Sequence, residues 1–345
     1  MWLFDADSRS SGRQCDLLLD IAIEGGGTNT SIKIASPERS KTYVERQIKK
    51  GSNINLSAKK AAKVVQDLID GELREIVSGS NDGACSAESC VSRENICYRL
   101  VMGMAGTENS DAVDTFFENL KYDTGMQKAV LVSDAEIAWH DQFDEGGVVI
   151  ISGTDGVVLG RNRNGDILAR SGFGAPASGR PSGAVLAHDY LACLEVHALF
   201  INGKPSAMTK ALNILDDYTT DVKNAKQRYG DKMILLQANN SARASVAKRI
   251  YEGGIRDDKP NLCAKTAVDQ AKDGMLSIIE SIDWSEEFKG LKYFVHGTFG
   301  RRLIRDMEET LVEKGWAQRQ VAVEEAAKPL DGALKLLLLL TKTEE

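Results

Sequence analysis

Residues 21–35 read IAIEGGGTNTSIKIA, and this stretch decides the fold. Residues 17–23 are almost entirely apolar, as expected of a buried strand, and isoleucine returns at alternate positions at Ile32 and Ile34. The three successive glycines carry no Cβ, so the backbone N–H groups of the turn can approach an anion closely. The stretch predicts a β-hairpin with an anion-binding turn. The alternative is a glycine-rich hairpin that binds nothing.

Polar side chains stand on both sides of these glycines. Thr28 and Thr30 place hydroxyl donors at the edge of the turn, with Asn29 between them. Glu24 ends the first strand, where a carboxylate can hold the hydrated Mg²⁺ of a nucleotide. The hairpin therefore offers groups for both an anion and its cation.

Composition and charge restrict the class of protein. A chain of 345 residues is long enough for two domains, each with its own core. Its net charge of −7 and its pI of about 5.4 argue against a nucleic-acid partner, because no basic stripe is available to neutralise phosphates. The apolar run Leu336–Leu340 is too short to cross a membrane, so no membrane partner is expected.

The cysteines indicate the compartment. Cys85, Cys90 and Cys97 cluster loosely, but no Cys-x-x-Cys pair and no nearby histidine supports a metal site. Irregular cysteines without a secretory signal predict a cytoplasmic protein with reduced thiols. Residues 1–15 lack an apolar core and are expected to form a disordered extension.

A second block of the chain repeats the pattern of the first. Gly147–Ile151 is an apolar strand, and a Gly/Thr turn follows it at residues 152–156 before another apolar segment. The predicted boundary falls near Asp134, which gives an N-terminal domain of residues 16–134 and a C-terminal domain of residues 135–345, whose last helix can pack back on the first domain. Two such units suggest a ligand held between domains, with each turn touching one end of a polyphosphate.

Three stretches in order carry a resemblance to a known family: residues 23–30, the turn Ile151–Thr154, and the strand end at residues 296–299. They resemble the nucleotide-binding elements of the actin-like ATPase superfamily of sugar kinases and heat-shock proteins. The closer resemblance is to N-acetylglucosamine kinase and its BadF/BadG/BcrA/BcrD-type ATPase relatives, over about residues 16–340. It implies a two-domain α/β fold, actin-like and related to ribonuclease H, with an interdomain cleft.

The resemblance also implies transfer of a phosphoryl group from Mg²⁺-ATP to the 6-hydroxyl of N-acetylglucosamine, a reaction that depends mostly on positioning and charge neutralisation. A small-molecule amino sugar would be the substrate, and a homodimer is a further expectation because family members are often dimers. The residues expected to bind ATP lie in the two turns and at the third strand end: Gly25, Gly26, Gly27, Thr28, Asn29, Thr30, Ser152, Gly153, Thr154 and Gly297. Glu24 would hold the metal.

The sugar and its proton acceptor would come from other loops. The resemblance assigns the substrate to Asn53, Ser133, Asp134 and Gly174. Glu108 stands where the family has the aspartate that accepts the hydroxyl proton, and a hydroxyl attacks better when its proton has an acceptor within reach. The alternatives are structural: Glu108 as a carboxylate near a helix start, and Asp134 as a helix cap.

Several positions depart from the family pattern. Glu24 and Glu108 replace aspartates, and Asp155 places a negative charge beside the expected phosphates. In the loop of residues 172–183 an Asp-Glu pair has become Gly179-Arg180. These departures favour a second hypothesis, a diverged pseudokinase or sensor that binds nucleotide or sugar. A glucosamine kinase or another ATPase of the family is a third.

Overall fold

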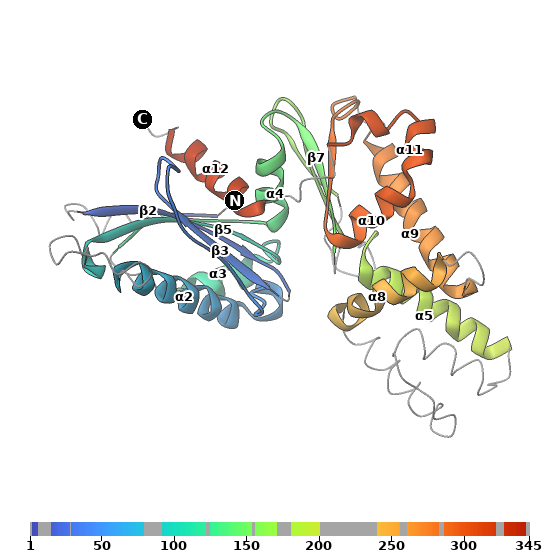
Figure 1. The fold of residues 1–345 in the computed structure, drawn as a ribbon, viewed down its shortest axis with the longest axis horizontal. Helices are drawn as coiled ribbons and strands as arrows, with labels where there is room; N and C mark the ends of the chain where they lie inside the picture. The colour runs from blue at the N-terminus through green and yellow to red at the C-terminus, as the bar shows by residue number, and fades with distance from the viewer. Residues whose placement is uncertain are drawn as a thin grey trace, which may run out of the picture. The chain divides into compact units, whose positions relative to one another are not determined.

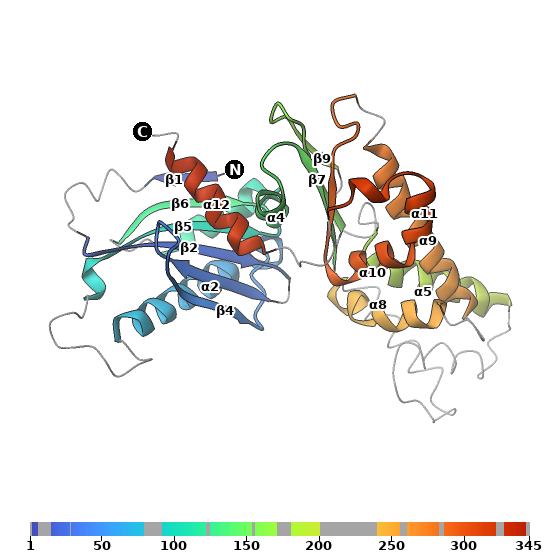
Figure 2. The same ribbon diagram turned by 45° about the horizontal axis from the view of Figure 1, so that its top comes forward.

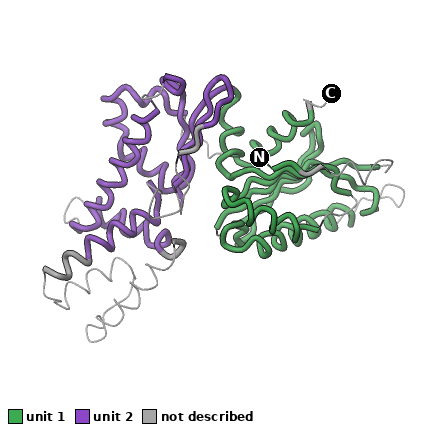
Figure 3. Tube along the Cα trace, turned by 180° about the vertical axis from the view of Figure 1, so that it is seen from behind, with its two compact units in different colours: residues 1–144, 327–345 green, residues 145–326 purple. Residues whose placement is uncertain are grey.

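The computed structural model describes residues 2–5, 15–27, 29–78, 92–121, 125–153, 156–170, 181–200, 240–255, 261–282, 286–321 and 328–342. The chain divides into two compact units, here called unit 1 (residues 1–144 and 327–345) and unit 2 (residues 145–326), as Figure 3 shows. The division follows residue 144 instead of lying near the expected Asp134, because the helix α4 (Asp134–Gln142) packs in the core of unit 1.

Unit 1 is built on a six-stranded sheet in which the central strands are parallel. Its strands, in spatial order, are β1 (Trp2–Asp5), β6 (Met126–Val132), β5 (Ile96–Met104), β2 (Leu17–Gly25), β3 (Thr30–Ala35) and β4 (Thr42–Ile48). Strands β2, β5 and β6 run parallel, whereas β1, β3 and β4 are antiparallel to their neighbours. The expected disorder of residues 1–15 is therefore wrong for residues 2–5, which gain backbone hydrogen bonds by pairing with β6.

Helices cover both faces of this sheet (Figures 1 and 2). Successive side chains of a strand point to opposite faces. Ile21 and Ile23 of β2 face the core under α2 (Ile54–Ser78) and α3 (Ser110–Asn119). Ala22, between them, faces α4 and α12 (Pro329–Lys342) on the other side. A short 3-10 helix, Arg93–Asn95, precedes β5.

Unit 2 repeats part of this arrangement in its own four-stranded sheet. The order is β10 (Tyr293–His296), β7 (Gly147–Ser152), β8 (Gly156–Arg161) and β9 (Ile167–Arg170). As in the series β5-β2-β3-β4, the first pair is parallel and the next two pairs are antiparallel.

One helical core packs against the sheet of unit 2. Its helices are α5 (Gly183–Phe200), α8 (Asn240–Gly254), α9 (Leu262–Ser281), α10 (Thr298–Asp306) and α11 (Glu308–Glu313), with a 3-10 helix at Ala317–Arg319. The helices α10 and α11 meet at Met307, whose side chain is buried.

The cysteines correct one expectation. Cys15 is bonded to Cys97 at the base of the first sheet, and Cys193 is bonded to Cys263 between α5 and α9, so these four are not the reduced thiols that the sequence predicts. The paired cysteines are 82 and 70 residues apart in the sequence, so no local pattern predicts which of them are bonded. Within the described ranges, every helix is too short or too polar to span a lipid bilayer.

Candidate functional site

The sheet of unit 1 gathers most of the predicted residues at one edge. In the register of the parallel strands, Glu24 lies beside Gly103, and Gly103 lies beside Val132. The carboxyl ends of β2, β5 and β6 therefore meet along one line, where parallel sheets commonly bind ligands. The loops that leave this edge carry the glycine turn, Glu108 and Asp134.

Backbone hydrogen bonds hold these loops together. Ala105 N–H donates to Gly25 O at 2.9 Å, and Ser52 N–H donates to Gly26 O at 2.9 Å. A Cβ at Gly25 would collide with Ser52 Oγ, so the close approach of the two loops requires glycine there. The first turn is thus fixed against the loops before α2 and after β5.

The turn itself uses one of the amides that the sequence assigns to an anion. Gly26 N–H donates to Asn29 O at 3.0 Å and closes the loop. Gly27 is exposed, and a Cβ there would meet nothing within 4 Å. Gly27 is the described position where an anion can approach this backbone most closely.

Thr30 has a different role from the one expected. Its side chain is fully buried, and Oγ1 lies 2.6 Å from Lys50 O and 2.8 Å from Ser52 Oγ. Because one hydroxyl proton serves these contacts, Thr30 fixes the loop of residues 50–52 instead of facing the phosphates.

Two carboxylates approach each other on the α4 face of the sheet. Glu24 is two residues after Ala22 and so points to the same side, where α4 begins at Asp134. Burial, followed by the charge of Asp134, raises the pKa of Glu24 from 4.5 to about 7. Ser133 caps this helix, since its Oγ accepts from Glu136 N–H at 3.1 Å, while Asp134 Oδ1 accepts from Ala135 N–H at 2.9 Å.

Asn53 and the loop after β5 lie together. Asn53 Oδ1 accepts from Asn55 N–H at 2.9 Å and caps the start of α2, so its amide nitrogen is the group left to meet a sugar hydroxyl. A Cβ at Gly106 would lie 2.9 Å from this oxygen. Glu108, two residues later, is exposed, and Asn109, not Ser110, caps α3 through Ala112 N–H.

Unit 2 holds a second cluster of predicted residues. Gly153 O accepts from Gly183 N–H at 2.9 Å, which joins the turn after β7 to the start of α5. Ser152 Oγ is buried and donates to Pro181 O at 2.5 Å, so it also fixes a loop. A Cβ at Gly153 would meet nothing within 4 Å, which leaves its backbone accessible.

The third predicted element lies against this turn. Gly297 has φ of +97°, and a Cβ there would collide with Ser152 O. A Cβ at Gly300 would lie 2.6 Å from Ser152 Cβ, so the first turn of α10 also approaches β7 closely. Ser152, Gly153 and Gly297 therefore form one cluster at adjacent strand ends.

Some predicted residues lie outside the described residues. They are Thr28, Thr154 and Gly174, together with the departures at Asp155, Gly179 and Arg180. Conversely, the sequence assigns no role to Ser52, Pro181 or Gly300, which the structure places in the loop contacts. The signal for Ser52 was its position in the motif that also contains Asn53, whereas Pro181 and Gly300 act through packing that leaves no local pattern.

The residues present fit a magnesium ion that a nucleotide delivers. Among the described residues, no group of three or more His, Cys, Asp or Glu side chains could hold a metal alone. Mg²⁺ usually binds through one or two carboxylates, with waters and substrate phosphates completing its shell. Glu24 and Asp134 supply this number, and burial together with the charge of Asp134 raises the pKa of Glu24 to about 7.

Comparisons with known proteins agree with this fold. No family model matches the chain. A curated N-acetylmuramic acid/N-acetylglucosamine kinase of Clostridium acetobutylicum is 34% identical over 160 residues, and the match spans 45% of this chain and less than half (46%) of that relative.

Solved structures match over more of the chain. A candidate N-acetylglucosamine kinase from Chromobacterium violaceum superposes with a TM-score of 0.67 and 19% identity, covering 93% of this chain and 99% of the other. A second, from Porphyromonas gingivalis, gives a TM-score of 0.56 and 14% identity, with 91% and 97% covered. The resemblance to these kinases is confirmed at the level of fold, and the chain shares the two-sheet α/β fold of these structures.

Proposed function

We propose that this chain, with its actin-like ATPase fold, transfers a phosphoryl group from ATP to the 6-hydroxyl of an N-acetylated amino sugar, with N-acetylglucosamine as the first candidate. One observation carries the proposal. The hydrogen bonds from Ala105 to Gly25 and from Ser52 to Gly26 bring a glycine turn, carboxylates and the Asn53 loop to one edge of a parallel sheet. These are the groups that a sugar, its proton and a phosphate require.

In the proposed reaction, the sugar 6-oxygen forms a bond to the γ-phosphorus of ATP as the bond to the β–γ bridging oxygen breaks. Glu108 accepts the hydroxyl proton, for which its exposed place on the loop after β5 makes it accessible. Asn53 binds sugar hydroxyls through its amide nitrogen, and Ser133 and Asp134 supply further polar contacts. ADP and the sugar 6-phosphate leave as products.

Glu24 and Asp134 would hold Mg²⁺, which when bound neutralises phosphate charge during transfer. The pKa of about 7 places Glu24 between its neutral and charged forms near neutral pH, and a cation would favour the charged form. Burial and the nearby charge of Asp134 thus raise the pKa of Glu24, and in the proposal the two carboxylates together attract Mg²⁺.

Unit 2 contains further residues that the sequence assigns to ATP. Gly153 presents an uncrowded backbone to the phosphates, and Gly297 opens the first turn of α10 beside it. Neither carries a side chain that a phosphate or ribose would have to displace. We assign these residues to ATP.

A nucleotide-binding module without transferase activity is the second candidate. The hydroxyl groups of Thr30 and Ser152, expected at the phosphates, are instead bonded to loop carbonyls. The Gly179-Arg180 replacement also removes carboxylates from the sugar loop of the family pattern. These observations favour binding over catalysis.

A coupled ADP-release assay separates the two candidates. The acceptor panel contains N-acetylglucosamine, N-acetylmuramic acid, glucosamine and glucose, with a no-sugar control for simple ATP hydrolysis. Turnover confined to the N-acetylated sugars supports the proposed kinase. ATP binding by calorimetry without turnover on any sugar identifies the binding module and refutes the kinase.

The base assignment has its own test in Glu108→Gln. Loss of a proton acceptor should lower kcat by roughly 10²- to 10⁴-fold while ATP affinity is unchanged. Glu118→Gln is the matched control, because Glu118 is an exposed carboxylate on α3. Full activity of Glu108→Gln would show that the base is another residue.

A further inference from the structure

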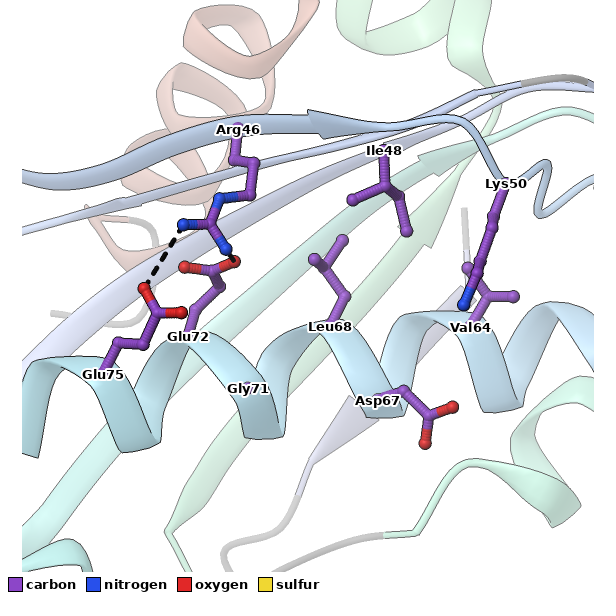
Figure 4. A pocket seen from close by; sticks show the side chains of 9 residues that line it. All are labelled: Arg46, Ile48, Lys50, Val64, Asp67, Leu68, Gly71, Glu72 and Glu75. Carbon is purple, nitrogen blue, oxygen red and sulfur yellow. Dashed lines mark hydrogen bonds and ion pairs between the residues drawn. The ribbon is translucent and has the colours of Figure 1, made fainter.

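A pocket of about 230 Å³ lies in unit 1 between the edge strand β4 and the helix α2. Figure 4 shows Ile48 of β4 and Leu68 of α2 facing each other across it, with Arg46 at one end and Lys50 at the other. None of its lining side chains belongs to the residues proposed above for ATP or sugar. The pocket is therefore a separate feature of unit 1.

Glu72 gives this pocket a buried, incompletely bonded anion. Its side chain is 2% exposed, and Oε1 lies 2.8 Å from Arg46 Nη1. Its second oxygen, Oε2, is buried without a hydrogen-bond partner. A buried carboxylate oxygen without a donor is unfavourable, so this position favours a ligand that brings an N–H group.

Charge at this end of the pocket also favours a cation. Arg46 Nη2 lies 3.3 Å from Glu75 Oε2, so a single guanidinium serves both Glu72 and Glu75. An ammonium group would place a second cation beside these carboxylates and could donate to Glu72 Oε2.

The middle of the pocket is apolar and open. Ile48 and Leu68 provide aliphatic walls, and Gly71 lies on the adjacent turn of α2. Nothing lies within 4 Å of a Cβ placed at Gly71, although glycine is less favourable than alanine inside a helix. The missing side chain keeps space for a short hydrocarbon chain.

The far end carries a cation. Lys50 is exposed, and within the described part of the chain no hydrogen bond or ion pair engages its ammonium group. Arg46 lies in β4 and Lys50 follows two residues after the end of that strand, and their side chains stand at opposite ends of the pocket (Figure 4). A carboxylate could therefore bind Lys50 while an ammonium group at the other end binds Glu72.

We propose that this pocket binds a small linear zwitterion, such as an ω-amino acid. Its ammonium group donates to Glu72 Oε2, its methylene chain lies over Ile48 and Leu68, and its carboxylate accepts from Lys50 Nζ. The site is independent of the proposed kinase reaction, because binding requires neither ATP nor sugar.

Isothermal titration calorimetry on the full-length protein tests this with 4-aminobutanoate, 6-aminohexanoate and 8-aminooctanoate as probes. Hexylammonium and hexanoate each keep one charge and serve as matched analogues. Saturable binding of one ω-amino acid, at least roughly tenfold tighter than either singly charged analogue, supports the proposal. Absence of binding by all three, or equal binding of the singly charged analogues, overturns it.

Variants then locate the site. Glu72→Gln and Lys50→Met should each weaken binding roughly tenfold or more by removing one charged partner. Gly71→Leu should abolish it by filling the pocket, whereas Lys59→Met, an exposed position on α2 outside the lining, should have no effect. If the Glu72→Gln variant does not fold, Lys50→Met still tests the site, because the Lys50 side chain is exposed and its replacement should not affect folding. Unchanged affinity in both Lys50→Met and Gly71→Leu places any binding elsewhere and overturns the assignment.

Discussion

The hairpins of unit 1 and unit 2 both hold a glycine turn against the start of a long helix. They differ in whether the strand or the loop carries the hydroxyl group at this contact. In each, a glycine carbonyl accepts from the amide at the start of the next long helix: Gly26 from Ser52 before α2, and Gly153 from Gly183 before α5, both at 2.9 Å. In unit 1 the strand has glycine, Gly25, and the loop supplies the hydroxyl of Ser52. In unit 2 the strand supplies the hydroxyl of Ser152.

The two hairpins differ most in charge. Glu24, the next-to-last residue of β2, has Asp134 near it, whereas the apolar Ile151 is the next-to-last residue of β7. The repeated geometry thus gives two glycine turns, and a pair of carboxylates adjoins the strand end of unit 1. This difference agrees with our proposal that the cation binds at unit 1.

Gly297→Ala should have the largest effect on this comparison. The new Cβ would collide with the carbonyl of Ser152 at a φ of +97°, so we expect about 4 kcal/mol of destabilisation in urea unfolding. Gly153→Ala is the control, because its Cβ meets nothing, and should stay within about 0.5 kcal/mol. Equal effects of the two substitutions would show that Gly297 does not pack closely against the carbonyl of Ser152.

Glu24→Gln should sharpen the difference in charge. Because the folded pKa of about 7 exceeds the ordinary 4.5, the folded state binds the proton more tightly, and stability is lost as pH rises through 7. Without Mg²⁺, the variant should be more stable than the wild type by roughly 3 kcal/mol near pH 9 and equal to it near pH 4. Thermal unfolding across this range measures it, and a pH-independent difference would contradict the assigned cause.

Thr30→Val and Ser152→Ala test whether the two hydroxyl contacts are equivalent. Each change leaves a loop carbonyl, of Lys50 or of Pro181, without its side-chain donor. We expect about 2 kcal/mol of destabilisation for each, by urea unfolding, with little change in ATP affinity. A large loss of ATP affinity with unchanged stability would show that these hydroxyl groups bind the phosphates.

Ser133→Ala should have the smallest effect. Ser133 caps α4 by accepting from Glu136 N–H, and its loss should cost about 1 kcal/mol. The start of α10 in unit 2 has no side-chain cap, so Thr298→Ala at its exposed first residue should stay within about 0.5 kcal/mol. Equal costs would remove this contrast between the two helix starts.

Local patterns predicted much of this fold. The alternation at Ile32 and Ile34 predicted β3. Contacts between segments that are distant in the sequence could not be predicted from these local patterns. Trp2–Asp5 is too short to signal a strand by itself, and the pairing of Cys193 with Cys263 depends on how α5 packs on α9.

The position of the candidate site could be predicted from the sequence, but some of its hydrogen bonds could not. Its position at the carboxyl ends of parallel strands follows from the order of strands and glycine turns. The occupation of the Thr30 and Ser152 hydroxyls does not, because a sequence shows which donors exist but not which acceptors lie nearest. The roles of Glu24 and Glu108 remain predictions for the experiments above.

The return of α12 to unit 1 has a consequence for synthesis on the ribosome. Unit 2 is continuous, from residue 145 to 326, whereas Leu334 and Leu337 of α12 cover Ala22 and Val130 only after all of unit 2 has been made. Nascent unit 1 therefore emerges with one face of its sheet covered only by α4, and this face is completed after unit 2 has been synthesised. Chaperone binding to that face during translation, ending when α12 leaves the exit tunnel, would be the visible sign of this delay.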